Sequence, residues 1–384
     1  MSIIIGGDLV PTKTNYQYFA DGRLDKLLDK KLIEMLESAD FRIFNLETPL
    51  TDCRTPIKKI GGALSAPSKT INAIKKMQID LFTLANNHIM DQGSMGLKST
   101  CEILKNAGID FVGAGDCVTE AMMPYVFKYQ EKKIGVYACV EHEFSIAGKR
   151  NAGANPIDLL EFPDHITHLR KQCDYVVVLY HGGKEYYRYP SPNLQKISKK
   201  FVEKGADLVI CQHSHCVGSY ERYKDSVIVY GQGNFLFDDG EMECLQTGML
   251  IKIDDDFSIS FIPICKDGYG VCLADSQSSK MILRDLETRS EEIKNPDIVE
   301  MKYKNFAEEN YHFYLKALNG KKIKKIPFKI LNKISGRRWE NFYFKKNYGE
   351  KELLALQNYI ECEAHRELLL CAIISKQREK NENS

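Results

Sequence analysis

Six side chains that can bind a divalent metal ion stand at the ends of short apolar runs in the first 215 residues. They are Asp8, Glu47, Asn87, His181, His213 and His215. Imidazole, carboxylate and amide oxygen together suit ions such as Mn, Fe or Zn, whereas a calcium site takes oxygen almost alone. His213 and His215 are two residues apart, so on an extended segment both can reach one ion or two neighbouring ions. Taken singly, each residue is as well explained by a turn, a cap or a hydrogen-bonding histidine. Their joint placement predicts a metal site.

The elements that must position these residues alternate between strands and helices. Buried strands are expected at 2–7, 41–46, 81–84, 111–113, 133–139, 175–180 and 208–211. Leu, Ile and Met recur at helical spacing at 24–38 and 68–77. This alternation is typical of an α/β protein, in which ligand-binding loops follow the strand ends. Each of the six candidates stands at such an end.

The chain changes character towards its second half. At 226–262, short apolar runs are separated by Asp and Gly, a pattern that indicates consecutive antiparallel strands or hairpins and therefore a mixed sheet system. From about Lys280 the sequence is more polar and helical, and 350–375 has the spacing of a core-packing helix. We expect one domain at 1–280 and a helical, partly basic appendage at 281–384.

Composition argues against a nucleic-acid-binding protein, a disulfide-rich protein and a membrane-spanning protein. With 53 basic and 52 acidic residues the chain has a net charge of +1, which does not favour nucleic-acid binding. The twelve cysteines are scattered without a CxxC pair and are expected to be reduced, although Cys211 and Cys216 flank the two neighbouring histidines and are candidate ligands. No window approaches 18 apolar residues and the first residues lack the features of a secretory signal. We expect a cytoplasmic chain, with peripheral association at the inner membrane surface as an option.

Longer motifs surround the six candidates. They are Gly7-Asp8, NLETPL at 45–50, ANNHIMDQG at 85–93, GAG at 113–115, YHGGKEY at 180–186, GADLVICQHSH at 205–215 and YGQGNF at 230–235. In order and approximate spacing, residues 1 to about 240 resemble the CapA-type capsule-synthesis proteins, which are similar to calcineurin-like metallophosphoesterases. The resemblance implies a metallophosphoesterase-like sandwich of two mixed β-sheets flanked by helices, with metal ions between the sheet edges.

The resemblance also implies roles for individual residues. Asp8 is similar to the aspartate of the first motif, Glu47 stands at the metal-bridging position, and Asn87 resembles the amide ligand. His181, His213 and His215 resemble the imidazole ligands. Two ions about 4 Å apart would clamp a phosphoryl group and activate a water. His88 resembles the histidine that protonates the leaving oxygen as a general acid.

Three positions depart from the phosphoesterase pattern. Val10 replaces a ligand histidine, Glu47 is longer than the usual aspartate, and Asn86 replaces a glycine. One of the two ions is therefore expected to bind more weakly, and Asn45 is a candidate extra ligand for it.

Five residues are candidates for supporting the ligands or contacting substrate. They are Asn45, Asn86, Asp91, Glu185 and Asn234. For Glu185, orientation of a ligand imidazole and a plain surface or capping role are equally open. An anionic substrate could also be met by Lys184, Tyr186, Tyr187 and Arg188, for which a solvated loop is the alternative.

A basic segment lies in the appendage. Residues 321–338 read KKIKKIPFKILNKISGRR, with eight basic residues and no acidic one. The segment could meet anionic lipid headgroups or a polyanionic polymer. Alternatively, it is a lid or connection whose apolar side packs on the main domain.

Three functions are consistent with the sequence. The first is a metal-dependent, phosphoesterase-like hydrolase in the biosynthesis or processing of a capsule or surface polymer. The second is a non-hydrolytic accessory protein that binds an anionic polymer such as polyglutamate, or its membrane synthase. The third is a metal-dependent amide hydrolase acting on a peptide-like polymer. A nucleic-acid partner is disfavoured, and the sequence does not indicate an oligomeric state.

Overall fold

Two mixed β-sheets form the centre of the fold. The computed structural model describes residues 2–238, 240–318, 342 and 345–382. The larger sheet has the order β16-β15-β14-β1-β2-β3-β4, and β13 also pairs with β1. Its strands are β1 (Ser2–Val10), β2 (Phe41–Leu46), β3 (Leu81–Thr83), β4 (Asp110–Val112), β13 (Asn234–Phe237), β14 (Thr247–Asp254), β15 (Ile259–Asp267) and β16 (Gly270–Leu273).

The second sheet has six strands in the order β11-β12-β10-β9-β7-β6. They are β6 (Tyr125–Tyr129), β7 (Lys132–Val140), β9 (Tyr175–His181), β10 (Leu208–Gln212), β11 (Tyr220–Tyr223) and β12 (Ser226–Val229). A small ribbon joins β5 (Ala114–Gly115) to β8 (Gly153–Ala154).

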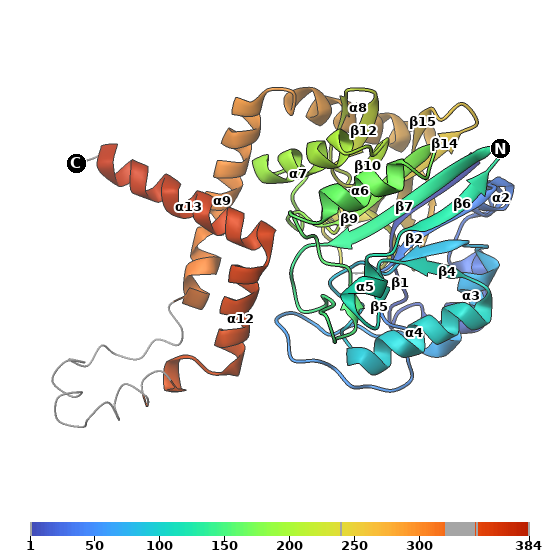
Figure 1. The fold of residues 1–384 in the computed structure, drawn as a ribbon, viewed down its shortest axis with the longest axis horizontal. Helices are drawn as coiled ribbons and strands as arrows, with labels where there is room; N and C mark the ends of the chain where they lie inside the picture. The colour runs from blue at the N-terminus through green and yellow to red at the C-terminus, as the bar shows by residue number, and fades with distance from the viewer. Residues whose placement is uncertain (1, 239, 319–341, 343–344, 383–384) are drawn as a thin grey trace. The chain divides into compact units, whose positions relative to one another are not determined.

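Helices flank the sheets (Figure 1). In the first 300 residues they are α1 (Tyr16–Ala20), α2 (Lys30–Ser38), α3 (Ile71–Lys76), α4 (Gly93–Ala107), α5 (Val118–Ala121), α6 (Phe162–Arg170), α7 (Pro192–Glu203) and α8 (Ser276–Glu292), with short 3-10 turns η1 (Leu24–Lys26), η2 (Ser68–Thr70) and η3 (Glu243–Gln246). Among the described residues, the helices of the C-terminal part are α9 (Pro296–Leu318), α12 (Glu350–Glu361) and α13 (Glu363–Glu382).

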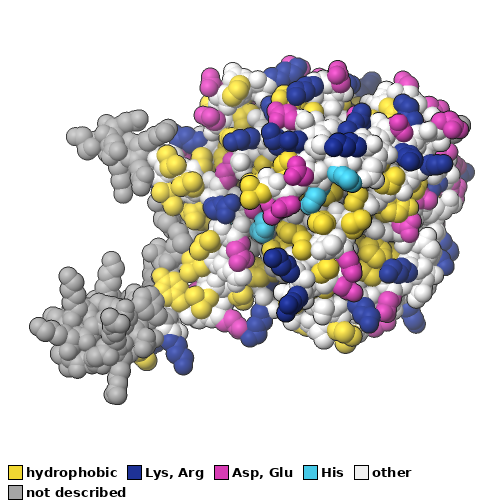
Figure 2. Space-filling view, viewed as in Figure 1, with side chains coloured by type: hydrophobic (Ala, Val, Ile, Leu, Met, Phe, Trp, Pro, Cys, Tyr) yellow, Lys and Arg dark blue, Asp and Glu magenta, His cyan; other side chains and the backbone are white. Residues whose placement is uncertain are grey.

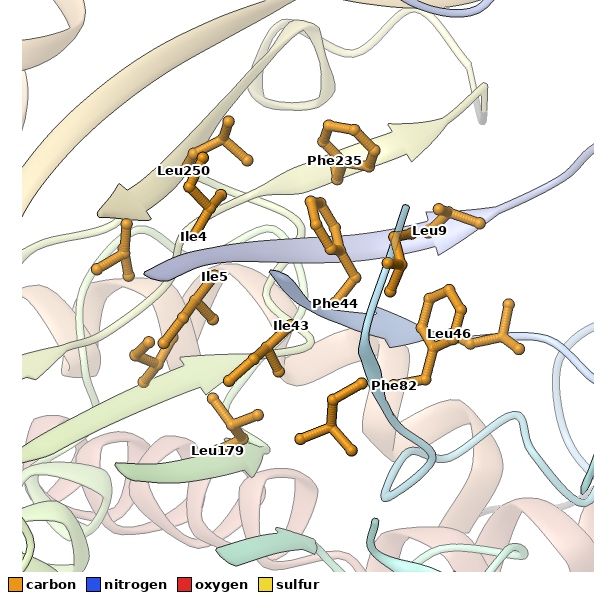
Figure 3. Packing of buried hydrophobic residues seen from close by; sticks show 14 of the residues in the cluster. Ile4, Ile5, Leu9, Ile43, Phe44, Leu46, Phe82, Leu179, Phe235 and Leu250 are labelled. Carbon is orange, nitrogen blue, oxygen red and sulfur yellow. The ribbon is translucent and has the colours of Figure 1, made fainter. Parts of the chain in front are cut away.

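Apolar side chains from both sheets form one core between them. Ile5 of β1 and Ile43 of β2 point towards Leu179 of β9, and all three are at most 1% exposed (Figure 3). Full burial of one such side chain stabilises the fold by about 1.5–3 kcal/mol. The opposite face of the second sheet is covered by α6 and α7, where the rings of Phe162 and Phe201 lie 4.3 Å apart. This packing holds the strand ends that carry the site.

The expected α/β sandwich of two mixed sheets with flanking helices is confirmed. The expectation of consecutive antiparallel strands or hairpins at 226–262 is confirmed for β14 and β15 and is wrong for β12 and β13. β12 pairs in parallel with β10 in one sheet, and β13 pairs in parallel with β1 in the other. Between them Gly233 adopts a φ of +70°, which glycine tolerates best and which lets the chain cross from one sheet to the other. Within the segment the antiparallel pair is β14 with β15, while β12 pairs antiparallel with β11, which precedes it.

The predicted helix at 350–375 is also wrong in its continuity. The structure has two helices there, α12 and α13, because Cys362 adopts an extended conformation with a ψ of 125°. The basic segment at 321–338 lies outside the described residues. No helix in the described part of the chain is long and apolar enough to cross a membrane.

The chain divides into two compact units. One comprises residues 1–57 and 63–300, and the other comprises 58–62 and 301–384. The division therefore falls beyond α8, in the first turns of α9. All the candidate site residues belong to the first unit.

Candidate metal centre

An irregularity in β1 places Asp8. Ile5 pairs with Ile43 but Asp8 pairs with Asn45, so β1 has one extra residue relative to β2. Such a bulge bends a strand and redirects the next side chain. Gly7 permits the close approach of the neighbouring chain, because a Cβ there would lie 2.1 Å from the carbonyl oxygen of Gly233. As a result Asp8 is 1% exposed and lies between β2 and β13.

The carboxylate of Glu47 lies at the centre of the site. Glu47 follows β2 and is fully buried, and neither of its oxygens has a hydrogen-bond partner among the described residues. Its Oε1 lies 3.1 Å from Nε2 of His181, the nitrogen that is also 3.1 Å from Oδ1 of Asn87. Two ligand atoms at right angles around an ion, each ~2.1 Å from it, would be ~3.0 Å apart. The spacing therefore fits three atoms that share an ion.

His213 and His215 occupy backbone conformations that are unusual for residues with a side chain. Their φ values are +87° and +55°. Such conformations cost about 1–3 kcal/mol each and cluster at functional sites. They direct both imidazoles into the site, where the His213 ring lies 4.8 Å from that of His181 and 6.0 Å from that of His215. Nδ1 of His213 is buried without a hydrogen-bond partner in the described chain.

Two sets of three candidate ligands share Glu47. One set is Glu47, His181 and His213, and the other is Asp8, Glu47 and His215; within each set the ligand atoms lie within 4.8 Å of one another. The orphaned oxygens of Glu47 and the mixture of carboxylate, imidazole and amide donors fit a divalent ion in each set. Glu185 forms a further set with His213 and His215.

The histidines differ in their protonation. Burial, and then the neighbouring imidazole of His181, lower the pKa of His213 well below its usual value, so that this ring is neutral, as a metal ligand must be. Burial opposes the charged form of His215, but the carboxylates of Glu47 and Asp8 outweigh it and raise the pKa of His215 to about 10. Burial likewise opposes the charged form of Asp8, yet its hydrogen bond to His215 keeps the pKa of Asp8 below the usual value. Without a cation, His215 and Asp8 thus form an ion pair.

Asp91 orients the candidate acid His88. Nδ1 of His88 lies 2.6 Å from Oδ2 of Asp91, which also accepts a hydrogen bond from the backbone N–H of Leu64 at 2.6 Å. Asp91 is fully buried, while the side chain of His88 is 18% exposed. Because the Asp91 carboxylate holds Nδ1 of His88, Nε2 is the nitrogen that can transfer a proton to a substrate.

Asn45, Asn86 and Asn234 support the ligands. Nδ2 of Asn45 donates to Oδ1 of Asp8 at 2.7 Å, and Oδ1 of Asn45 accepts from Nδ2 of Asn86 at 3.0 Å. The amide oxygen of Asn45, which sequence reasoning offered as an extra ligand atom, thus faces Asn86. Nδ1 of His215 lies 2.8 Å from Oδ1 of Asn234 and 3.3 Å from Oδ2 of Asp8.

The other candidates lie at different distances from the site. The ring of Tyr186 is 6.0 Å from that of His215, and Nζ of Lys184 is 3.8 Å from Oε2 of Glu185. Tyr187 is buried. The structure does not bring Arg188 to the ligands, because its guanidinium pairs with Glu243 at 2.6 Å and the Val217 carbonyl at 3.2 Å.

The candidate cysteines differ from the histidines. Cys211 is buried with its Sγ 3.6 Å from the hydroxyl of Ser198, and burial raises the pKa of its thiol to about 12. Burial also raises the pKa of the Cys216 thiol. Neither thiol belongs to a ligand set among the described residues.

Sequence reasoning missed two acidic residues, Glu141 and Glu143. Both are buried and form a set of ligand atoms with His213. They follow β7 directly, so the rule that selected the other strand ends would also have found them.

Several solved structures are partly similar to this fold. A phosphatase from Mycoplasma pneumoniae has 16% sequence identity and a TM-score of 0.42, with 70% of this chain and 94% of that chain covered. The NAD nucleotidase of Haemophilus influenzae has 13% identity and a TM-score of 0.41, with 75% and 62% covered. Similarity at this level carries no conclusion about activity.

Sequence relatives are more informative. The capsule biosynthesis protein CapA of Bacillus anthracis is 33% identical over 183 residues, which are 46% of this chain and 44% of that protein. The PGA biosynthesis protein CapA of Bacillus subtilis (strain 168) is 29% identical over 215 residues, 54% and 55% of the two chains. The chain spans about half the length of these curated relatives. The model of the bacterial capsule synthesis protein family PGA_cap matches residues 2–239, and the chain therefore belongs to this family.

Proposed function

We propose that this protein is a metal-dependent, phosphoesterase-like hydrolase that acts in the biosynthesis or processing of a capsule or other surface polymer. The observation that carries the proposal is the buried carboxylate of Glu47, which lacks a hydrogen-bond partner in the described chain and belongs to two ligand sets at once. A carboxylate that bridges two ions is the arrangement used for in-line attack on phosphate esters.

Buried charge supports the presence of cations. Asp8, Glu47, Glu141 and Glu143 are each at most 9% exposed and lie around the same histidines. Ionised carboxylates are costly to bury unless they are paired or bind a metal ion. Asp8 pairs with His215, whose pKa the charge of Glu47 also raises, while the oxygens of Glu47 accept no hydrogen bond from the described residues. Divalent ions would offset the remaining negative charge.

The chain supplies the groups that such a reaction needs. His181, His213 and Asn87 with Glu47 would hold one ion, and a second would lie between Glu47, Asp8 and His215. When bound, two such ions lower the pKa of a shared water and offset charge on the phosphate oxygens. His88, held by Asp91, would donate a proton from Nε2 to the leaving oxygen.

The partner that we propose is an anionic small molecule or surface polymer, and a complex with a membrane synthase would place the protein at the inner membrane surface. On the face shown in Figure 2, the described Lys and Arg side chains are scattered among acidic ones. We propose that the metal centre recognises the anion, and the net charge of +1 does not favour nucleic acid.

The test is reconstitution with Mn, Fe, Zn or Mg, followed by assays on a phosphomonoester, a phosphodiester and a polyglutamate chain. His88→Ala and His213→Ala serve as controls. Phosphoester hydrolysis that is lost in both variants would support the proposal. Cleavage of polyglutamate without cleavage of the phosphoesters would indicate that the metal centre hydrolyses amide bonds instead.

A non-hydrolytic accessory role is the second candidate. It is favoured by Val10, which stands at a strand end where the phosphoesterase pattern has a ligand histidine, so the position at Asp8 and His215 has fewer ligands. A relative carries the name PGA biosynthesis protein. Binding of polyglutamate or a synthase without turnover under every metal condition would favour this role and refute the hydrolase.

A further inference from the structure

A short acidic segment, Glu141 to Glu143, lies against two of the candidate ligands. It follows β7, the neighbour of β9 in the second sheet, and β9 ends at His181. Both glutamates are buried, at 1% and 9% exposure. Neither is among the six residues proposed to hold the ions.

Glu143 faces the amide of Asn87. Its Oε2 lies 3.4 Å from Nδ2 of Asn87, while Oδ1 of the same amide lies 3.1 Å from Nε2 of His181. An asparagine binds a cation through its oxygen, and an ionised carboxylate can only accept hydrogen bonds. If the amide were turned by 180°, two oxygens would face each other at Glu143. The carboxylate therefore favours the orientation in which Oδ1 of Asn87 faces the ligands.

Glu141 faces the imidazole of His213. Its Oε1 lies 3.5 Å from Nε2 of His213, and its Oε2 accepts a hydrogen bond from the backbone N–H of Gly183 at 3.2 Å. Nδ1, on the other side of the ring, is the buried nitrogen that has no hydrogen-bond partner within the described chain. A negative charge beside Nε2 favours the tautomer with its proton there, which leaves the lone pair of Nδ1 for an ion.

We propose that Glu141 and Glu143 are positioning residues for one metal position. Glu141 selects Nδ1 of His213 as the ligand atom, and Glu143 selects Oδ1 of Asn87. Both groups act from the outer side of the same ligand set, whose other members are Glu47 and His181. The proposal rests on the metal centre of the proposed function, although not on hydrolysis.

The two carboxylates can be neutralised one at a time in the full-length protein. Glu141→Gln and Glu143→Gln keep the size of the side chain but remove the charge that selects the tautomer or the amide orientation. Glu221→Gln is a matched control, because Glu221 is also buried but accepts from the hydroxyl of Tyr230 at 2.5 Å and pairs with Lys199 at 3.2 Å. Since each glutamate has its own variant, failure of one to fold leaves the other as a test.

Metal affinity is the first readout. Mn²⁺ is titrated against a fluorescent chelator, and loss of such a supporting group typically weakens metal binding about 10- to 100-fold. We expect that loss for one ion in Glu141→Gln and in Glu143→Gln, with the other ion and the Glu221→Gln protein unchanged. Unchanged affinity in both variants would overturn the proposal. Loss of a third bound ion would also overturn it, because the glutamates would then be ligands themselves.

The tautomer of His213 is the second readout and needs no metal. Histidine-selective ¹⁵N labelling and NMR of the chelator-treated protein should show the proton of His213 on Nε2 in the wild type and a changed tautomer distribution in Glu141→Gln. The same tautomer in both proteins would refute the role of Glu141 even if metal binds. A wild type that binds no Mn²⁺ in the first experiment would refute the metal centre itself, so the two failures are distinct.

Discussion

Replacement of Glu47 by glutamine should remove most of the stabilisation of the fold by metal. In the wild type, two buried carboxylate oxygens lack hydrogen-bond partners in the described chain and are shared by two ligand sets. Glu47→Gln keeps the shape but removes the charge. In the absence of metal the variant no longer carries an unpartnered buried charge, which costs more than the roughly 1–3 kcal/mol of a neutral polar group, but it also loses the attraction between Glu47 and charged His215. Because the two effects oppose each other, the metal-free variant should stay close to the wild type in stability.

With metal the wild type should become clearly more stable than the variant. A ligand present at 100 times its dissociation constant stabilises the folded state by about 2.7 kcal/mol. For a unit of this size, that corresponds to a rise in Tm on the order of 5–10 °C. Because Glu47 takes part in both sets, Glu47→Gln should lose most of this rise. Substitution of a residue in only one set, such as Asp8→Asn, should lose less.

The assay is thermal unfolding followed by circular dichroism, with chelator or with a series of Mn²⁺ concentrations. Glu221→Gln again serves as the control, since it removes a buried carboxylate that has partners in the same unit. An equal metal-induced rise in Tm for wild type and Glu47→Gln would refute the shared-ligand reasoning. A large loss of stability of the metal-free variant would show that the carboxylate is satisfied without an ion.

Three further results are expected. His88→Ala should lower kcat by about 10²- to 10⁴-fold with unchanged metal content by elemental analysis, because the lost group is a general acid; loss of metal would contradict this role. In chelator-treated protein, the raised pKa of His215 gives stability that is complete below pH ~6.5 and is lost as the pH rises through about 10, while the lowered pKa of Asp8 gives stability that is lost below pH ~4. Urea unfolding at a series of pH values should show the free energy of unfolding falling at both ends of the range. His215→Asn should flatten the fall at alkaline pH, and an equal fall in the variant would refute the assignment to His215. Arg42→Met should cost about 1.5–3 kcal/mol in urea unfolding without changing metal affinity, since Nε of buried Arg42 donates to the Leu36 carbonyl at 2.6 Å; a change in affinity would contradict the separation of this residue from the site.

Local sequence pattern predicted the strands well because apolar runs are read directly from the chain. The strand expected at 41–46 is β2, and β9 differs from the expected 175–180 by one residue. Pattern could not show that β12 and β13 pair in different sheets, since pairing depends on residues far away in the chain. Nor could it place the bulge that turns Asp8 towards Asn45, because strand register is a property of two strands together.

The candidate ligands were identifiable because their chemical types follow strand ends, but their supporting groups were not. The orientation of Asn87 depends on Glu143, which is 56 residues away. The network from Asp8 through Asn45 to Asn86 likewise joins residues about 40 positions apart. Such contacts leave no periodic trace in a single sequence. For Glu141 and Glu143, the one signal in the sequence is their place just after a predicted strand.

The two ligand positions are unequal in what surrounds them, and this difference bears on function. The candidate position at His181 and His213 has the amide of Asn87 and the two buried glutamates, Glu141 and Glu143, beside it. The position at Asp8 and His215 lacks the histidine that Val10 replaces, and there His215 has a raised pKa, so an ion must displace a proton to bind. Glu185, grouped with His213 and His215, is the described carboxylate that could complete this position. Because two-ion hydrolysis needs both positions filled, occupancy at Asp8 and His215 separates a hydrolase from a protein that only binds its polymer.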